Sequence, residues 1–171
     1  MANTTWTPPT LTLPLTVADG GTGQITAPAA FNALAAMDGL PDVDHTANGP
    51  HTSTFAAGAA ITVMDLVYLG AAGKWLQTDA DVEATANGML AVSLESKVDA
   101  QAMNVALPGS FVRDDTWVWT IGARLYVGLT AGQITETKPS ALDDVVRTVG
   151  FAVSADVIYF DPSPDYITIL V

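Results

Sequence analysis

Short strand-forming segments separated by turn residues recur from residue 55 onward, and this pattern most constrains the fold. β-Branched and aromatic residues occur there in runs that are bounded by Gly, Asp, Asn or Pro, which predicts strands. Only residues 79–87 could hold a helix. Closely spaced short strands favour a small antiparallel barrel or sandwich over a parallel α/β sheet. The predicted strands are residues 61–69, 74–77, 89–94, 103–107, 111–113, 117–119, 124–127, 133–135, 145–153, 157–160 and 166–171.

The first 38 residues have a different pattern. Between residues 11 and 17, apolar residues recur at every second position, and Pro14 lies among them. An alternating strand that contains proline suits a sheet edge or a ribbon that pairs with another chain. A glycine-rich turn at residues 18–23 follows it. Thr26 then predicts the N-cap of a helix of about three turns, which is too short to be stable alone in water.

Three parts of the chain are therefore expected. Residues 1–38 form an extended N-terminal arm with one short helix, and residues 55–171 form a β-rich domain. Between them, residues 39–54 are rich in Asp, Asn, Gly, Pro, His and Thr. That composition indicates a linker or a long surface loop.

Charge and composition disfavour several classes of partner. The formal net charge is −12, and the six basic residues are spread singly along the chain. Binding to nucleic acid or to an anionic membrane surface needs clustered Lys or Arg, so we expect neither. The most apolar stretch, residues 56–69, is too short for a membrane span and contains Asp65. The absence of cysteine excludes disulfides and thiolate metal sites.

Two parts of the chain resemble phage virion proteins. The first reads Leu13-Pro14-Leu15-Thr16-Val17-Ala18-Asp19-Gly20-Gly21-Thr22-Gly23 and continues as Gln24-Ile25-Thr26 and an Ala-rich run to Met37. It resembles the "L-P-V-x-x-G-G-T-G-x-T" segment and following helix of phage tail-fibre and related proteins. The second, residues 55–160, is similar to a β-domain of capsid decoration proteins, head fibres and some tail fibres. The matching pieces are Gly58-Ala59-Ala60-Ile61, Asp65-Leu66-Val67-Tyr68, Asp79-Ala80-Asp81, Leu107-Pro108-Gly109, Leu125-Tyr126-Val127 and Val149-Gly150-Phe151-Ala152.

This resemblance implies a trimeric, non-enzymatic component of the virion, assembled in the host cytoplasm. The chain lacks a repetitive shaft and an obvious terminal adhesin, which favours a capsid decoration (cement) or head-fibre protein that stabilises the shell. Its partners would be the major capsid protein or a neighbouring virion protein. The alternative is a short tail fibre or tail-tip protein that binds a host surface glycan or protein. A polysaccharide hydrolase is a distant third.

The residues expected to bind the partner all lie in the arm and its helix. Alternating apolar residues suit strand addition to another chain, and a tryptophan in an arm suits anchoring in a partner's pocket. These residues are Trp6, Leu11, Leu13, Leu15, Val17, Gly20, Gly21, Gly23, Phe31 and Leu34.

No motif predicts catalysis, a cofactor or a metal. The stretch Gly21-Thr22-Gly23 lacks the third glycine and the βαβ unit of a dinucleotide site. Asp79, Asp81 and Glu83 alternate like calcium ligands, but the loop's glycine and bidentate glutamate are missing, so a solvated acidic turn is favoured.

Other candidate residues have plainer interpretations too. His45 and His51, the only histidines, could bind a metal only if copies of the chain met around an axis. The acidic pairs Asp42 and Asp44, Asp114 and Asp115, and Asp143 and Asp144 fit turn chemistry. Trp117 and Trp119 are expected on one strand face, as core or subunit interface.

Overall fold

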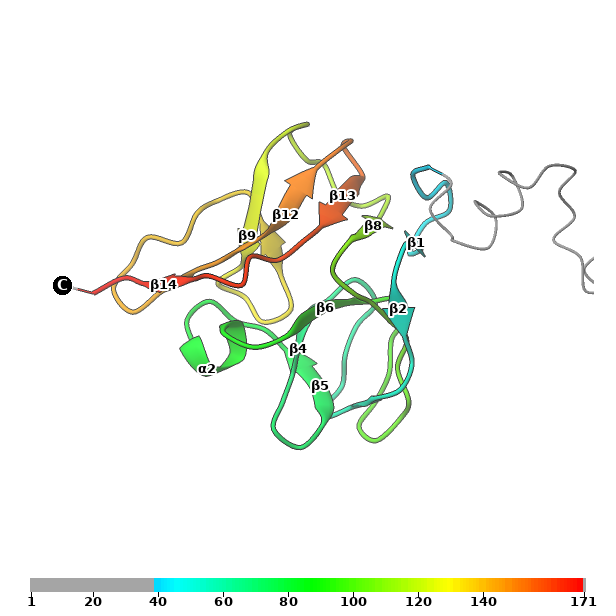
Figure 1. Cartoon of the computed structure of the whole chain (residues 1–171), viewed down its shortest axis with the longest axis horizontal. Helices are drawn as coiled ribbons and strands as arrows, with labels where there is room; N and C mark the ends of the chain where they lie inside the picture. The colour runs from blue at the N-terminus through cyan, green and yellow to red at the C-terminus, as the bar shows by residue number, and fades with distance from the viewer. Residues whose placement is uncertain (1–38, 171) are drawn as a thin grey trace, which may run out of the picture. The chain divides into compact units, whose positions relative to one another are not determined.

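The computed structural model describes residues 39–170, which fold into strands and one helical turn (Figure 1). Gly39–Val171 forms a compact unit by itself. The mostly β prediction is confirmed for this unit. The arm and the helix expected in residues 1–38 lie outside the described residues. The elements are β1 (Ala47–Asn48), β2 (His51–Thr52), β3 (Ala56–Ala57), β4 (Leu66–Leu69), β5 (Lys74–Gln77), α2 (Glu83–Ala86), β6 (Leu90–Ser93), β7 (Val105–Ala106), β8 (Ser110–Arg113), β9 (Arg124–Val127), β10 (Ile134–Thr135), β11 (Val145–Val146), β12 (Thr148–Ala152), β13 (Val157–Phe160) and β14 (Ile167–Thr168).

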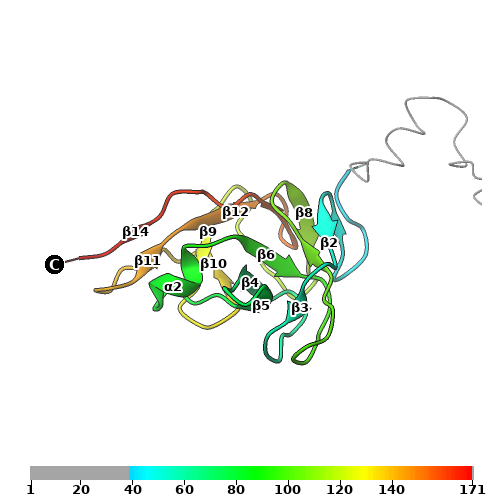
Figure 2. The ribbon, with the colours of Figure 1, turned by 60° about the horizontal axis from the view of Figure 1, so that its bottom comes forward.

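The strands form two six-stranded sheets and one two-stranded sheet. The first sheet has the order β1-β8-β13-β12-β9-β10, and all its neighbours are antiparallel. The second has the order β2-β7-β6-β4-β5-β3, in which only β3 and β5 are parallel. Strands β11 and β14 pair at the same end of the unit as α2 (Figure 2). Within residues 39–170 the sheets do not close into a barrel.

The main hydrophobic core draws on both six-stranded sheets. Leu125 and Ile158 of the first sheet belong to the same buried cluster as Leu66, Leu90 and Val92 of the second. Burying one such side chain stabilises the fold by about 1.5–3 kcal/mol. The two sheets therefore stabilise each other through this shared core.

A second core covers the opposite face of the second sheet. Successive side chains on a strand point to opposite faces, so Ala91 of β6 faces away from its neighbours Leu90 and Val92. It belongs to a smaller cluster with Trp75 and Met103. Strand β6 is buried along its whole length because both of its faces are covered.

The segment expected to be a linker contains two paired strands. In β1, Ala47 pairs with Val112 of the first sheet, and in β2, His51 pairs with Ala106 of the second. The chain passes from one sheet to the other at Gly49, where a Cβ would lie 2.8 Å from the Cα of Ser110. Residues 47–48 and 51–52 are therefore strand residues. Their composition indicated a loop, but backbone pairing with β8 and β7 makes them strands.

Residues 117–119 do not form a strand, contrary to the prediction. The backbone N–H of Trp117 donates to the Asp114 carbonyl and that of Trp119 to the Ala155 carbonyl, at 3.1 and 2.8 Å, so the segment joins no sheet ladder. The predicted side-chain alternation is nevertheless present. Both indoles pack on the main core, whereas Val118 between them is 88% exposed.

Several predicted strands are shorter or divided. In residues 61–69 the ladder begins only at Leu66, after Met64 with a φ of 68°. Residues 145–153 hold two strands, β11 and β12, which belong to different sheets. Among the described residues, no helix has the length and apolar character needed to cross a membrane.

Candidate functional site

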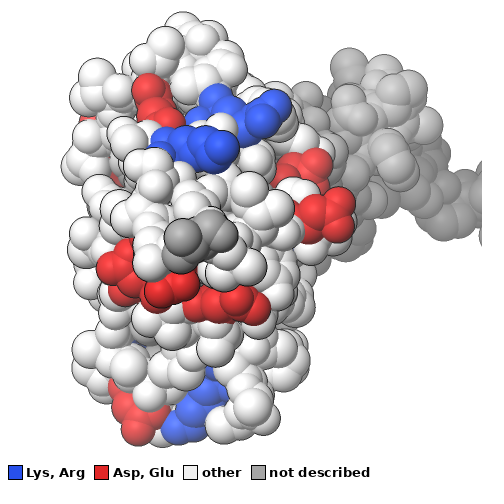
Figure 3. All heavy atoms as spheres, turned by 90° about the vertical axis from the view of Figure 1, so that its left-hand side faces the viewer, with Lys and Arg blue, Asp and Glu red and all other residues white. Residues whose placement is uncertain are grey.

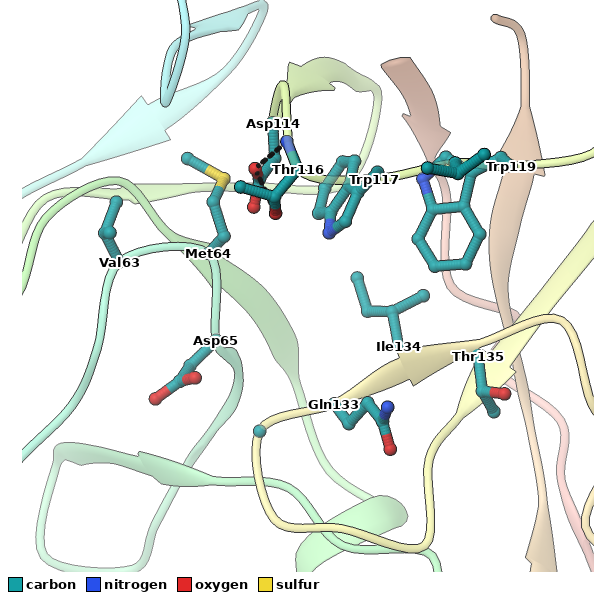
Figure 4. Close-up of a pocket in the computed structure, with 12 residues that line it drawn as sticks. Val63, Met64, Asp65, Asp114, Thr116, Trp117, Trp119, Gln133, Ile134 and Thr135 are labelled. Carbon is teal, nitrogen blue, oxygen red and sulfur yellow. Dashed lines mark hydrogen bonds between the residues drawn. The ribbon is translucent and has the colours of Figure 1, made fainter. Parts of the chain in front are cut away.

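A groove of about 450 Å³ lies over the main core, between the segment after β8 and strand β10 (Figure 4). Trp117 and Trp119 come from that segment, and Ile134 and Thr135 come from β10. The turn before β4 contributes Asp65. These elements are distant in sequence, so sequence patterns gave no sign of the groove.

The two tryptophans form one wall of the groove. Their ring centroids are 5.4 Å apart and the rings are inclined by 52°. Figure 4 shows both indoles above Ile134. The Nε1 of Trp119 is buried and has no hydrogen-bond partner among the described residues. Indole rings in such a wall offer apolar faces for stacking.

Both carboxylates beside the groove have structural hydrogen bonds. Asp65 Oδ2 accepts from Gln77 Nε2 at 2.7 Å and from the backbone N–H of Thr62 at 2.8 Å. Asp114 Oδ1 accepts from the backbone N–H and the hydroxyl of Thr116 at 2.8 and 2.7 Å. These bonds stabilise the turns that shape the groove. Because both carboxylates have this structural role, the groove suits binding of a ligand.

A second cluster lies where the segment before β1 meets the end of β8. His45 Nε2 is 3.6 Å from Asp44 Oδ2 and 3.9 Å from Asp114 Oδ1. One ligand atom from each of the three residues can be chosen so that all lie within 4.8 Å of one another. Asp114 is distant in sequence from Asp44 and His45, so spacing could not have revealed the cluster.

The outer face of the first sheet carries a row of aromatic side chains. Tyr159 is the register partner of both Phe151 and Phe111. The rings of Phe111 and Tyr159 have centroids 5.2 Å apart, and Phe151 is 43% exposed. Phe111 and Tyr159 are half-buried, and a partly exposed aromatic row of this kind is typical of a surface that contacts another protein.

The sequence-predicted residues fall into several groups. All the residues expected to bind a partner lie outside the described residues. A further tryptophan, Trp75, is fully buried with its ring edge-on to Phe55. His51 does not belong to the cluster formed by His45. The acidic stretch behaves as a turn, because Asp79 Oδ1 accepts from the backbone N–H of Asp81 at 3.0 Å.

Most basic side chains in the described unit have specific partners. Lys74 pairs with Asp99 and Lys97 with Glu95, at 2.8 and 3.1 Å. On the face shown in Figure 3, basic groups lie at the top and at the bottom, each beside acidic groups, and further acidic groups lie between them. This face presents no continuous basic stripe.

Comparisons of the chain with protein-family models, with curated proteins and with solved structures found no match.

Proposed function

We propose that this chain is a non-enzymatic phage virion protein, a trimeric capsid decoration or head-fibre protein that binds the shell through its N-terminal arm. The single observation that carries the proposal is the resemblance of residues 13–37 and 55–160 to virion proteins. The autonomous unit that begins at Gly39 supports it, because that unit contains its own hydrophobic core. Residues 1–38 are then left for attachment.

For the fold of the β-domain we propose a sandwich. Its support is the core cluster that contains Leu66 and Val92 of one six-stranded sheet and Leu125 and Ile158 of the other. Packed sheets with a shared apolar layer are the usual way to bury two β surfaces.

Contact with neighbouring copies would use the outer face of the first sheet. The aromatic row of Phe111, Tyr159 and Phe151 supports this assignment. Aromatic residues supply much of the binding energy in protein interfaces. Several arms on one oligomer would then turn weak individual contacts into tight attachment.

The first test deletes residues 2–37. We expect the truncated protein to remain a folded oligomer and to lose attachment to particles, because the core of the β-domain stays intact. Addition of purified protein to shells that lack it, followed by sedimentation, measures attachment. A truncated protein that still decorates the shells would show that the arm is not the anchor.

A matched pair of point variants tests the arm without shortening it. Leu13→Asp places a charge on the apolar side of the alternating stretch, and Thr12→Asp places it on the polar side. Strand addition through the apolar side predicts lost attachment for Leu13→Asp alone. Equal attachment of both variants would contradict this mode of binding.

The second candidate function is host recognition at the tail. The groove with Trp117 and Trp119 favours it, because aromatic faces with nearby polar groups suit a glycan. Cryo-EM or immunogold labelling separates the two functions. Density only at the tail would reject the decoration proposal, and density on the shell would reject the tail proposal.

A further inference from the structure

The cluster of His45, Asp44 and Asp114 has spacings that differ from those of hydrogen bonds. The two nitrogen-to-oxygen distances from His45 Nε2 are 3.6 and 3.9 Å. Hydrogen bonds between N–H and oxygen have lengths of about 2.7–3.2 Å. The imidazole nitrogen therefore faces both carboxylates without bonding to either.

Those spacings are close to the separation of ligand atoms around a shared metal ion. Zinc binds nitrogen and oxygen at about 2.0–2.2 Å, which places the ligand atoms of a tetrahedral site roughly 3.4 Å apart. The two distances from His45 Nε2 exceed that separation by roughly 0.2 and 0.5 Å. The positions of the two flanking carboxylates thus suit an ion between them and the imidazole.

Asp114 is the most buried of the three residues. Its side chain is only 8% exposed, whereas those of His45 and Asp44 are 40% exposed. Oδ1 accepts from Thr116, whereas Oδ2 accepts no hydrogen bond from residues 39–170. The Asp114 oxygen that lies 3.9 Å from His45 Nε2 is Oδ1, which Thr116 already holds by two hydrogen bonds.

The remaining hydrogen bonds hold the carboxylates in place. Asp44 accepts the backbone N–H of Asp115 through Oδ1 at 2.9 Å, and its Oδ2 is the oxygen nearer His45. Arg113, the nearby cation, pairs with Asp115 and Asp156. Asp44 and Asp114 offer two carboxylates, whose charges would balance a divalent cation.

We propose that Asp44, His45 and Asp114 bind a divalent cation of the zinc type. One imidazole with two carboxylates suits zinc, whereas calcium and magnesium prefer oxygen ligands alone. Three protein ligands leave a coordination position for water. The ion would join the segment before β1 to the end of β8, which are also linked by the two-pair β1–β8 ladder and by the hydrogen bond from Asp115 to Asp44. This proposal does not depend on the virion role.

Zinc titration of the full-length chain by calorimetry tests the site. His45→Asn is the main variant, because Asn tolerates the left-handed φ of 57° at this position. His51→Asn is its matched control, since His51 is the other histidine and lies outside the cluster. We expect one zinc ion per chain in the wild type and in His51→Asn, and at least a tenfold weaker affinity in His45→Asn.

Thermal unfolding gives a second readout. Zinc at a hundredfold excess over its dissociation constant should raise the wild-type Tm by roughly 5–10 °C, and EDTA should reverse the rise. His45→Asn should lose it, and Asp44→Asn should reduce it while keeping the backbone hydrogen bond. Equal zinc affinity of the wild type and His45→Asn would overturn the proposal. So would an equal loss in His51→Asn, or a Tm rise with calcium as large as that with zinc.

Discussion

At the scale of single residues, backbone proximity makes Gly150 necessary. It lies in β12 at a shift in the pairing with β9, and it has a φ of 154°. A Cβ at this position would lie 2.0 Å from the carbonyl oxygen of Tyr159. The neighbouring strand β13 therefore leaves no room for a side chain.

Replacement of this glycine should be severely destabilising. We expect Gly150→Ala to lower the free energy of unfolding by about 3–5 kcal/mol, because β12 and β13 must separate to admit the methyl group. The matched control is Gly88→Ala, where a Cβ would contact nothing within 4 Å. Its effect should stay within about 0.5 kcal/mol. Urea unfolding followed by circular dichroism measures both, and similar midpoints would refute the argument from proximity.

At the scale of elements, Arg147 connects three segments. It lies between β11 and β12 and is 5% exposed. Its Nη1 donates to the carbonyls of Ala86 and Gly88 at 2.7 and 2.6 Å, and its Nε donates to that of Ser163 at 2.8 Å. Burial lowers the pKa of its guanidinium, which nevertheless stays charged at neutral pH. One cation thus satisfies carbonyls at the end of α2 and near the C-terminal segment.

Truncation of this side chain should loosen that end of the domain. We expect Arg147→Ala to cost about 2–4 kcal/mol, because it leaves three carbonyls without their donor. The control Arg124→Ala removes an exposed arginine and should change stability by less than about 0.5 kcal/mol. Hydrogen exchange adds a local readout: Arg147→Ala should exchange faster around residues 83–88. Unchanged exchange there would show that Arg147 does not hold α2.

At the scale of the whole molecule, carboxylates with lowered pKa values make stability depend on pH. The backbone N–H of Asn104 chiefly lowers the pKa of Glu95 below 4.5, and Lys97 adds to this. Hydrogen bonds from Lys74 and Ser154 likewise lower the pKa values of Asp99 and Asp156. A carboxyl group whose pKa is lower in the folded state than in the unfolded state stabilises the fold at pH values above the ordinary carboxyl pKa. That contribution is lost as the pH falls through the lowered value.

Acid should therefore unfold the protein progressively, and Glu95→Gln should weaken this dependence. We expect this variant to lose less unfolding free energy than the wild type below about pH 4.5. The difference should be no more than about 1 kcal/mol, because the Glu95 side chain is partly exposed. Lys97→Met should retain most of the wild-type dependence, since Asn104 makes the larger contribution. Chemical denaturation at a series of pH values measures how the free energy of unfolding of each variant depends on pH. A Glu95→Gln curve parallel to the wild type would contradict the assignment.

Strands with strong local signals were predicted at their observed bounds. Lys74–Gln77, Arg124–Val127 and Val157–Phe160 are examples, and each is a compact run of β-forming residues beside a turn. The segment 117–119 has the same local composition but forms no ladder, because its backbone groups bond to turn carbonyls. The local sequence indicates how readily a segment adopts an extended conformation. It does not indicate which strand is available to pair with that segment.

By itself, the sequence determined the mostly β class and the alternation of Trp117 and Trp119, since both follow from residue type and the two-residue period of an extended chain. Only the tertiary structure decided the assignment of β1 and β2 to different sheets, the groove over the main core, and the meeting of His45 with Asp114. Each of these depends on contacts between residues far apart in the chain. Such contacts arise from packing of the whole domain, which no local pattern encodes.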